Sequence, residues 1–505
     1  MKNDMGHLKV LLIYANTQME PLVPLGVACV YTVLKEAGFE VKIFDTTLYR
    51  SDSENNSQAA RAGSLQVKPV DYASVGVIGK ETNPVDDFVK MVDGFKPDLI
   101  GLSCVELTYR QGLNLLGAVQ ERRIPVIVGG CFATFSPEII LQDDRVDMVC
   151  TGEGEEVILA LARRMAKKES IDDIPGLWLK KSSGEMVRNR VGELVDVNST
   201  ILPKFDGFAP ERIYRAMDGV IYRMVPIEIS RGCPYQCTYC SAPMFQRVFK
   251  PAGRWLRYKT VERIIEEVDY YVKEYDAQYF YFVSETFLAM PDEERKKFYS
   301  RYRKYRIPFW FNTRPETVTE YDLKCLEEIG CHRISIGIES GHYELRRRLL
   351  KRNYKNDTVL NAVNIVLNTK IQLSVNNMVG FPDETREMFF DTVELNRQFK
   401  AHSHSISIFQ PFRGTELFDY CVLKGYWDPD KLCADSFATP SLNMTSMSKE
   451  TIKGLYRTFN LYLNMEKDKW PRIREAEKFD EEGNKAFAEL CRGLIQSERT
   501  TLVNK

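Results

Sequence analysis

The sequence predicts an α/β protein that ends in a helical region. Strand-like and helix-like segments alternate from Leu8 to Arg164, and the alternation returns between Val225 and Tyr420. Further downstream the apolar residues follow helical spacing only. Alternation of this kind is typical of parallel sheets with helices on their faces. Because 505 residues exceed what one hydrophobic core holds, we expect about two to four domains.

The composition is that of a globular protein, with 44% hydrophobic and 28% charged residues and a formal net charge of -1. It lacks the basic excess of nucleic-acid-binding proteins, so no nucleic acid partner is expected. Met1–Gly6 is polar and no apolar run reaches the roughly 18 residues of a membrane span, so we expect neither a signal peptide nor a transmembrane segment. Twelve scattered cysteines then favour a reducing, cytoplasmic setting in which cysteine clusters bind metal.

In the first part of the chain, short apolar runs predict buried parallel strands. These runs cover residues 9–14, 40–44, 99–103, 126–128 and 146–150. A helix is predicted from Leu25 to Ala37, with Gly38 as its C-cap. The polar stretch from Ser51 to Ser64 is predicted to be a surface loop.

Three features follow predicted strands, where open parallel sheets bind their ligands. They are Ser103, the pair Gly129-Gly130, and the turn from Gly152 to Glu155. Paired glycines let a backbone approach a ligand without side-chain obstruction. Taken alone, a Gly-Gly pair at a strand end is more often plain turn chemistry.

The motif with the most specific spacing is RGCPYQCTYC, which places Cys233, Cys237 and Cys240 in a C-x3-C-x2-C pattern after a predicted strand at 225–230. Cysteine thiolates are the usual ligands of iron–sulfur clusters. Three ligands would leave one iron of a 4Fe-4S cluster open to a small molecule. A zinc site is the alternative, but zinc prefers four ligands and the next cysteine downstream is Cys325. The spacing therefore favours a cluster.

Further strands are predicted at 279–283, 309–312, 333–338, 372–379 and 405–409. Together with the strand before the cysteines they make six βα units. Chemistry in βα barrels takes place at the carboxyl ends of the strands. Five segments lie at these ends: VSETF (283–287), NTRPE (312–316), SIGIESG (335–341), VGFPDET (379–385) and QPFRGTE (410–416).

These segments and the cysteine motif resemble the radical S-adenosylmethionine (SAM) superfamily over residues 226–420. Residues 8–164 resemble the cobalamin-binding domain that precedes many such enzymes. The resemblance implies a Rossmann-like cobalamin-binding domain (1–195), a linker (196–224), a partial (β/α)6 TIM barrel (225–420) and a C-terminal helical region (421–505). It also implies three cofactors: a 4Fe-4S cluster on Cys233, Cys237 and Cys240, SAM, and cobalamin.

By the same resemblance, the nucleotide tail of cobalamin would lie near Ser103, Gly129, Gly130 and, less strictly, Thr134. Domains of the methionine synthase type carry an Asp-x-His-x-x-Gly motif whose histidine ligates cobalt. The corresponding stretch ANTQMEPLVP (15–24) has no histidine, and His7 is the only one nearby. We therefore expect cobalamin without a histidine lower ligand. A vestigial domain without corrinoid is the alternative.

For SAM, the resemblance implies that Glu285 contacts the amino group. Many relatives have two adjacent acids there, whereas Ser284 replaces the first in this chain, and a helix-capping pair is the alternative. Glu339 and Ser340, expected to be the most exposed residues of their segment, would line the ribose. Four further residues are implied to lie near the cofactor: Tyr239 and Gly380 at the adenine, Arg314 facing the cavity, and Arg352. The family turn has a glycine where this chain has Asp383.

The basic run from Arg346 to Arg352 is expected to lie mostly on a solvated helix face. Arg352 is the candidate within it for binding the SAM carboxylate. Downstream, helices are predicted over 448–466, with a capping box at its start, and over 476–497. The apolar face of the first, Leu455, Phe459 and Leu463, is expected to pack as core and to close one mouth of the barrel.

The domain order favours methyl transfer to an unactivated carbon, in which one SAM supplies the methyl group through cobalamin and a second yields the 5'-deoxyadenosyl radical. The alternatives are a radical cyclase, a ring-contracting or a C–C coupling enzyme. A methylthiotransferase is less favoured, because Cys29, Cys104, Cys131 and Cys150 do not have the spacing of a second cluster. A non-catalytic corrinoid or metal sensor is a further alternative. Small-molecule, lipid, porphyrin and peptide substrates stay open, a flavodoxin or ferredoxin-type electron donor is expected, and no catalytic residue is assigned.

Overall fold

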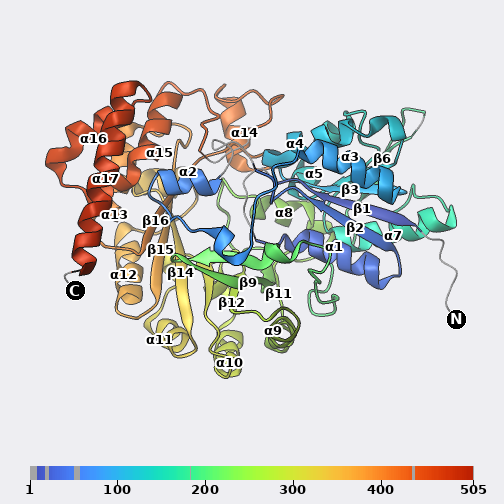
Figure 1. Cartoon of the computed structure of the whole chain (residues 1–505), viewed down its shortest axis with the longest axis horizontal. Coiled ribbons are helices and arrows are strands. Elements are labelled where there is room, and N and C mark those ends of the chain that lie inside the picture. The colour runs from blue at the N-terminus through green and yellow to red at the C-terminus, as the bar shows by residue number, and fades with distance from the viewer. Residues whose placement is uncertain (1–7, 17–21, 51–56, 182, 435–437, 504–505) are drawn as a thin grey trace. The chain divides into compact units, whose positions relative to one another are not determined.

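A computed structural model of the chain describes residues 8–16, 22–50, 57–181, 183–434 and 438–503 (Figure 1). These residues fall into two compact units. The first contains Val70–Pro234, Ser241–Val283 and the described residues before position 51. The second contains Ser57–Pro69, Tyr235–Cys240 and the described residues from Ser284 onward. The domain boundaries given above stay a prediction.

The first unit contains a seven-stranded sheet in the order β2-β1-β3-β4-β5-β6-β7. The first five strands along this order pair in parallel, and the last two are antiparallel additions. The strands are β1 (Lys9–Tyr14), β2 (Glu40–Asp45), β3 (Leu99–Ser103), β4 (Val126–Gly129), β5 (Met148–Cys150), β6 (Leu177–Lys180) and β7 (Met186–Arg188). The five predicted strands of this region are confirmed.

Helices cover both faces of this sheet, which explains why its central strands are apolar throughout. In Figure 1, α3 (Pro84–Phe95) and α4 (Glu106–Gly117) lie on one side of β1 and β3, and α1 (Leu25–Glu36) and α7 (Gly154–Lys167) lie on the other. Helix α1 ends as predicted, since Gly38 follows it with a φ of 91°.

The loop predicted from Ser51 to Ser64 was wrong in its second half. Residues Ser57–Gly63 form helix α2, while residues 51–56 lie outside the described part. The segment QAARA contains good helix formers, and the turn after it is anchored. The side chain of Gln66 is buried and accepts a 2.9 Å hydrogen bond from the backbone N–H of Ile406. A polar segment is therefore ordered by partners that lie far away in the sequence.

The barrel strand before the cysteines is longer than predicted, because it is one arm of a hairpin. Strand β9 (Val220–Glu228) pairs antiparallel with β8 (Tyr214–Met217) through Asp218-Gly219. Both loop residues have positive φ, 52° and 84°, the two-residue turn that Asp-Gly favours. On its other side β9 pairs in parallel with β12 (Tyr279–Val283). The short ladder β10 (Ser230–Arg231) and β11 (Arg257–Tyr258) was not predicted.

The second unit contains four parallel strands in the order β16-β15-β14-β13. They are β13 (Phe309–Thr313), β14 (Cys331–Glu339), β15 (Gln372–Val379) and β16 (Ser403–Ile408). Figure 1 shows α11 (Glu320–Glu328), α12 (Asn356–Leu367) and α13 (Arg386–Asn396) along these strands. With β9 and β12 they supply the six strands of a partial (β/α)6 barrel, so the predicted fold class is confirmed.

Four helices follow: α14 (Glu416–Leu423), α15 (Lys449–Asn464), α16 (Trp470–Ala476) and α17 (Glu481–Val503). The helix predicted over 476–497 is confirmed as α17, but it starts later, at Glu481, and is separate from α16. Asp480 starts a new helix there, since its carboxylate accepts from the N–H of Gly483 at 2.7 Å. Helix α15 begins as predicted, because the Ser448 side chain accepts from the N–H of Thr451.

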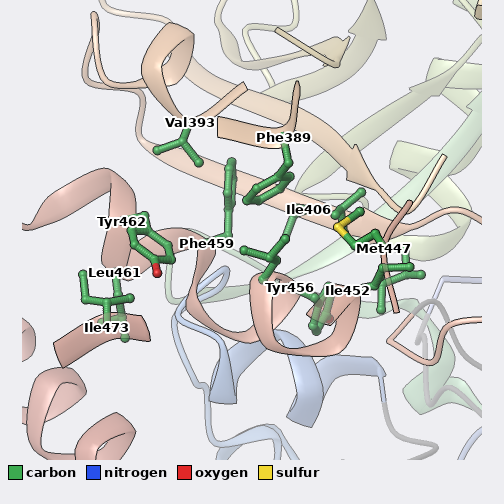
Figure 2. Packing of buried hydrophobic residues seen from close by; sticks show 13 residues of the cluster. Phe389, Val393, Ile406, Met447, Ile452, Tyr456, Phe459, Leu461, Tyr462 and Ile473 are labelled. Atoms are coloured by element: carbon green, nitrogen blue, oxygen red, sulfur yellow. The ribbon is translucent and has the colours of Figure 1, made fainter. Parts of the chain in front are cut away.

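The apolar face of α15 packs as core, as expected. Figure 2 shows Phe459 beside Phe389, with Ile406, Ile452 and Tyr456 in the same buried cluster. Leu455 and Phe459 are completely buried, and each such side chain contributes about 2 kcal/mol through removal from water. None of the helices in the described ranges is long and apolar enough to cross a membrane.

Candidate functional site

Two of the sequence-predicted residues meet at the carboxyl edge of the N-terminal sheet. Ser103 ends β3 and Gly129 ends β4, and the parallel register places them opposite each other. Ser103 is half-buried, and its hydroxyl has no side-chain partner in the part of the chain that the structure describes. Edges of this kind bind ligands in open parallel sheets. The edge therefore presents an available hydroxyl beside a strand end without a side chain.

Gly130 is required by the backbone itself. Its φ is 106°, and a Cβ atom there would overlap the carbonyl oxygen of Cys104. Gly129 differs, because a Cβ atom would come only within 3.7 Å of the Cys150 Cβ, which is ordinary contact. Packing therefore explains why position 130 is a glycine, but it does not explain why position 129 is one.

Thr134 is held by partners within its own unit. Its hydroxyl donates to the carbonyl of Gly130 at 3.1 Å and accepts from the N–H of Gly152 at 3.0 Å. The residue is buried, with 7% of its surface exposed. Its geometry ties the turn after β5 to the short helix α5 (Cys131–Phe135).

The acidic turn after β5 was expected to face a ligand, and the structure instead pairs it with arginines. Arg231 donates to Glu153 at 2.8 Å, to Glu155 at 2.6 Å and to Glu228 at 3.1 Å. Arg257 donates to Glu153 at 2.6 Å. Burial opposes ionisation of Glu153, but the two arginines outweigh it and lower the pKa of this carboxyl.

This network fixes the chain immediately before the cysteine motif. Arg231 is followed by Gly232, whose φ is 101° and whose absent Cβ would lie 2.7 Å from the Trp255 ring. Cys233 is buried, and its carbonyl accepts a hydrogen bond from the Gln246 side chain. The first cysteine of the motif is therefore set by an arginine anchor and a turn that only glycine adopts without strain.

The other two cysteines lie in the second unit. Cys237 is buried, Cys240 is half-buried, and the N–H of Cys240 donates to the carbonyl of Cys237 at 3.2 Å. Arg314, directly after β13, donates to the Cys237 sulfur at 3.1 Å. Arg314 also forms an ion pair with Glu316 at 2.6 Å. The structure thus joins Arg314, predicted to face the cavity, to a cysteine of the motif.

Tyr239, Glu339 and Arg352 come together as one buried network. Arg352 donates to the Tyr239 hydroxyl at 2.8 Å, to Glu339 at 3.2 Å and to the Tyr354 hydroxyl at 3.0 Å. It also donates to the Gly337 carbonyl. Burial raises the pKa of Glu339 although Arg352 lowers it. The network connects the cysteine loop (residues 233–240) with the carboxyl end of β14.

The expectation that Glu339 and Ser340 are the most exposed residues of their segment was wrong. Their exposed fractions are 9% and 0%. Glu339 sits at a bulge of β14 with a φ of 67°, which turns it inward. The Ser340 hydroxyl accepts from the N–H of His342 at 3.2 Å, so it holds the turn after the strand.

The basic run is only partly solvated. Arg348 and Lys351 are exposed, as expected. Arg346 is completely buried and donates to the carbonyls of Ser340 and Tyr354 at 2.6 and 2.8 Å. A π-helical turn over Leu345–Leu349 rotates Arg346 inward. Arg346 therefore braces the turn that follows β14.

Glu285, which follows β12, has an available carboxylate. It has no hydrogen-bond or ion-pair partner in the part of the chain described here, whereas the preceding Ser284 is buried. Its side chain is solvent-accessible, yet protein surrounds it closely enough that desolvation alone raises its pKa. An accessible acid with no cation beside it among the described residues fits a cationic ligand group.

The turn after β15 is built around Gly380 and Glu384. Gly380 has a φ of 84°, and a Cβ there would lie 3.1 Å from Ile452 of α15. The buried Glu384 carboxylate accepts from the N–H groups of Gly380 and Phe381 at 2.6 and 3.2 Å. Burial raises the pKa of Glu384 to about 8, against the two hydrogen bonds that lower it. Asp383 accepts from the hydroxyls of Tyr420 and Tyr426.

Sequence reasoning missed Arg231, Glu384 and Arg346 as organisers of these loops. Arg231 adjoins the cysteine motif, and its position could have suggested a structural anchor. Glu384 lies within a segment already singled out. Nothing local distinguishes Arg346 from the exposed Arg348, because only the π-helical turn separates their environments.

Comparisons with known proteins identify two domains in the chain. The sequence matches the Radical SAM superfamily over residues 227–395 and the B12 binding domain over residues 12–162. An uncharacterised methyltransferase from Pyrococcus horikoshii is 28% identical over 66% of this chain and 72% of its own length. A cytidylyl-2-hydroxyethylphosphonate methyltransferase from Streptomyces wedmorensis is 22% identical over 88% of this chain and 87% of its own.

Two solved structures share the fold. The cobalamin-dependent SAM radical enzyme OxsB, with aqua-cobalamin and SAM bound, superposes with a TM-score of 0.65 at 16% identity and covers 96% of this chain and 70% of its own. The radical SAM methyltransferase TsrM from Kitasatospora setae gives 0.57 at 19% identity over 83% and 76%. The chain therefore contains a radical SAM domain and a B12 binding domain, and its cofactors are a 4Fe-4S cluster, SAM and cobalamin.

Proposed function

We propose that the protein is a cobalamin-dependent radical SAM methyltransferase that acts on an unactivated carbon. The observation that carries the proposal is the presence of both modules in one chain: a B12 binding domain over residues 12–162 and a radical SAM domain over residues 227–395. Methyltransferase relatives that span most of the chain support the same activity.

The residues present fit the three cofactors. Cys233, Cys237 and Cys240 would hold the cluster, and the arginine N–H directed at the Cys237 sulfur suits a thiolate. The Glu285 carboxylate, which has no partner among the described residues, would bind the SAM amino group. Ser103 and Gly129, at the carboxyl edge of the parallel sheet, would receive the nucleotide tail of cobalamin.

Other predicted residues would act indirectly, by positioning the residues that bind the cofactors. Thr134 and Gly130 hold the loop beside the cobalamin edge, and Gly380 with Glu384 shapes the turn after β15. The Tyr239–Arg352–Glu339 network would fix the cysteine loop against the ribose side of the site. Because the N–H groups of Arg352 already have four partners, we propose that it positions Glu339 and Tyr239.

When bound, the cluster and SAM supply a radical that abstracts hydrogen, and cobalamin supplies a methyl carrier. The protein's part is to bind and orient. The Glu285 carboxylate offers an acceptor to an ammonium group, and the buried Glu339–Arg352 pair keeps the β14 end rigid. No histidine stands in residues 15–24, so we propose that cobalamin binds without a histidine lower ligand.

A radical cyclase is the second candidate, favoured by one observation. An anaerobic magnesium-protoporphyrin IX monomethyl ester cyclase from Rubrivivax gelatinosus is 22% identical over 81% of this chain and 74% of its own length. The products of turnover separate the two functions. Methyl transfer consumes SAM in two ways and yields S-adenosylhomocysteine as well as 5'-deoxyadenosine, whereas a cyclase that uses no methyl group yields 5'-deoxyadenosine alone.

The experiment uses reduced, cofactor-loaded enzyme with SAM that carries a trideuterated methyl group. Lipid, porphyrin, peptide and other small-molecule candidates are supplied separately. We expect both SAM-derived products and a trideuteromethyl group in one substrate. Formation of 5'-deoxyadenosine without any S-adenosylhomocysteine would contradict methyl transfer. Cys237→Ala serves as the control, since loss of the cluster removes 5'-deoxyadenosine.

We further propose a cytoplasmic setting and a flavodoxin or ferredoxin-type electron donor. The twelve cysteines scattered through the chain support a reducing compartment. The cluster requires a low-potential one-electron donor to start each turnover, and small redox proteins of these two classes supply such electrons.

A further inference from the structure

Arg314 occupies an unusual position for a charged side chain. It follows β13, only 6% of its surface is exposed, and its Nη1 donates to the Cys237 sulfur at 3.1 Å. Its guanidinium carbon lies 3.7 Å from the centroid of the Tyr235 ring. Its Nε and Nη2 contact the Glu316 carboxylate at 2.8 and 2.6 Å. Two residues of the cysteine loop, Tyr235 and Cys237, thus contact Arg314 at the end of β13.

Burial of an arginine costs free energy unless partners compensate for it. Glu316 compensates on one side only, and its side chain is 27% exposed, which weakens the pair through solvent screening. The remaining side of the guanidinium faces a ring and a sulfur. A neutral thiol is a weak acceptor, whereas a cluster thiolate is a strong acceptor for a cationic donor. The arrangement is therefore best satisfied when Cys237 is a thiolate ligand.

Two other buried arginines of this unit, Arg352 and Arg346, direct their hydrogen bonds to oxygen atoms. Arg352 directs its N–H groups to oxygen atoms of Tyr239, Glu339, Tyr354 and Gly337. Arg346 likewise donates to the carbonyls of Ser340 and Tyr354 and to the Asn356 side chain. Only Arg314 among these three combines a full positive charge with a hydrogen bond to a motif sulfur.

We propose that Arg314 is a positioning residue that raises the reduction potential of the cluster through its hydrogen bond and charge at Cys237. Hydrogen bonds to cluster sulfurs and nearby charge are general determinants of cluster potentials. Reduction adds one electron and makes the cluster one unit more negative, with no bond or proton changing. A cation at van der Waals distance stabilises the reduced form more than the oxidised form. Arg314 would therefore help the cluster accept its electron from a flavodoxin or ferredoxin-type donor.

The inference rests on the proposed function, because it requires Cys237 to be a cluster ligand. The test is a redox titration of full-length, anaerobically reconstituted protein, with dithionite and mediators, followed by electron paramagnetic resonance. For Arg314→Gln we expect unchanged iron content and about a tenfold less favourable reduction equilibrium, which is a midpoint about 59 mV lower for one electron. Arg314→Lys keeps the positive charge but lacks the planar guanidinium group, so its midpoint should fall by less than that of Arg314→Gln.

Glu316→Gln provides a test of opposite sign. Removing the carboxylate leaves the Arg314 charge less compensated, so the midpoint should rise relative to wild type. Arg348→Gln removes an exposed arginine of the same unit, which pairs with Glu344, and should leave the midpoint unchanged. If Arg314→Gln does not fold, Arg314→Lys and Glu316→Gln still test the proposal through the direction of their shifts.

Equal midpoints in wild type and in the Arg314 and Glu316 variants, each with a full cluster, would overturn the proposal. A wild-type protein that binds no cluster after reconstitution would instead contradict the proposed function itself. The two failures are distinguishable, because the first is seen in the potential and the second in the iron content.

Discussion

The guanidinium of Arg231 donates a 2.8 Å hydrogen bond to the carboxylate of Glu153, across 78 positions of sequence. Arg231 stands two residues before the first cysteine of the motif, and Glu153 stands in the turn after β5 of the B12 binding domain. Within the first unit, a buried ion pair therefore couples the segment that leads into the cysteine motif with the turn after β5.

Replacing Arg231 should destabilise the first unit. Arg231→Gln would leave Glu153, Glu155 and Glu228 without their shared cation, and removing one partner of a buried ion pair costs about 3–5 kcal/mol. We expect a clear fall in the thermal unfolding midpoint. Arg303→Gln is the matched control, because its pair with Glu328 is exposed, at 63% and 45%, and such pairs contribute about 0–1 kcal/mol. Equal midpoints for both variants would contradict the anchoring role.

The paired glycines should respond differently to alanine. Gly130→Ala forces a Cβ onto the Cys104 carbonyl at a φ of 106°, so it should lower stability. Gly129→Ala should fold normally, since its Cβ meets only ordinary contact. If cobalamin approaches this strand end, the second variant should still bind it more weakly. Two measurements separate these effects: the unfolding midpoint and the amount of corrinoid that stays bound after gel filtration. If Gly129→Ala retained as much corrinoid as the wild type, Gly129 would not be part of the cobalamin site.

Glu384 predicts a pH dependence of stability. Its folded pKa of about 8 lies above its ordinary value of 4.5, so between these values the folded protein holds a proton that the unfolded chain has lost. Stability should therefore decrease as pH rises from about 4.5 to 8, by up to about 1.4 kcal/mol per pH unit. Glu384→Gln cannot titrate and should remove this slope.

Glu387→Gln is the control for that experiment. The hydrogen bonds at its exposed carboxyl lower the pKa of Glu387, so it is ionised in both states above pH 5. The difference between its unfolding midpoint and that of wild type should stay constant from pH 5 to 8. A wild-type slope that survives in Glu384→Gln would show that other groups cause it.

Glu285 is expected to contribute to SAM binding. Glu285→Gln keeps the shape but removes the negative charge, so SAM should bind about tenfold more weakly, the effect of losing about 1.4 kcal/mol from a charge-assisted hydrogen bond. Isothermal titration calorimetry on cluster-loaded protein measures this. Glu293→Gln, whose exposed carboxylate pairs with Lys296, should bind SAM as wild type does. Unchanged affinity in Glu285→Gln would exclude the contact.

The parallel strands and the cysteine motif were predictable from the sequence because their signals are local. An apolar run such as KVLLIY at 9–14 identifies a buried strand, and the C-x3-C-x2-C spacing indicates three candidate cluster ligands. The hairpin at Asp218-Gly219 also had a local signal, which was missed. Helix α2 was missed because its polar composition gave no amphipathic pattern and its anchor at Ile406 is 340 positions away from Gln66.

The side-chain networks could not be predicted in the same way. Arg314 and Cys237 are 77 positions apart, and Arg352 and Tyr239 are 113 apart. Their contacts depend on which strand ends adjoin which loop. The inward turn of Glu339 depends on a bulge and the burial of Arg346 on a π-helical turn. Neither irregularity leaves a recognisable mark in a single sequence.

The most direct test of the central claim is the iron and corrinoid content per chain, after anaerobic purification from cells supplied with cobalamin. The account predicts about four irons and about one corrinoid in the wild-type protein. It also predicts loss of the iron, with the corrinoid kept, when Cys233, Cys237 and Cys240 are all replaced by alanine. Replacement of Cys325 should change neither content. Zinc in place of iron, or iron that survives the triple replacement, would contradict the cluster assignment, and iron without corrinoid would contradict cobalamin as a cofactor.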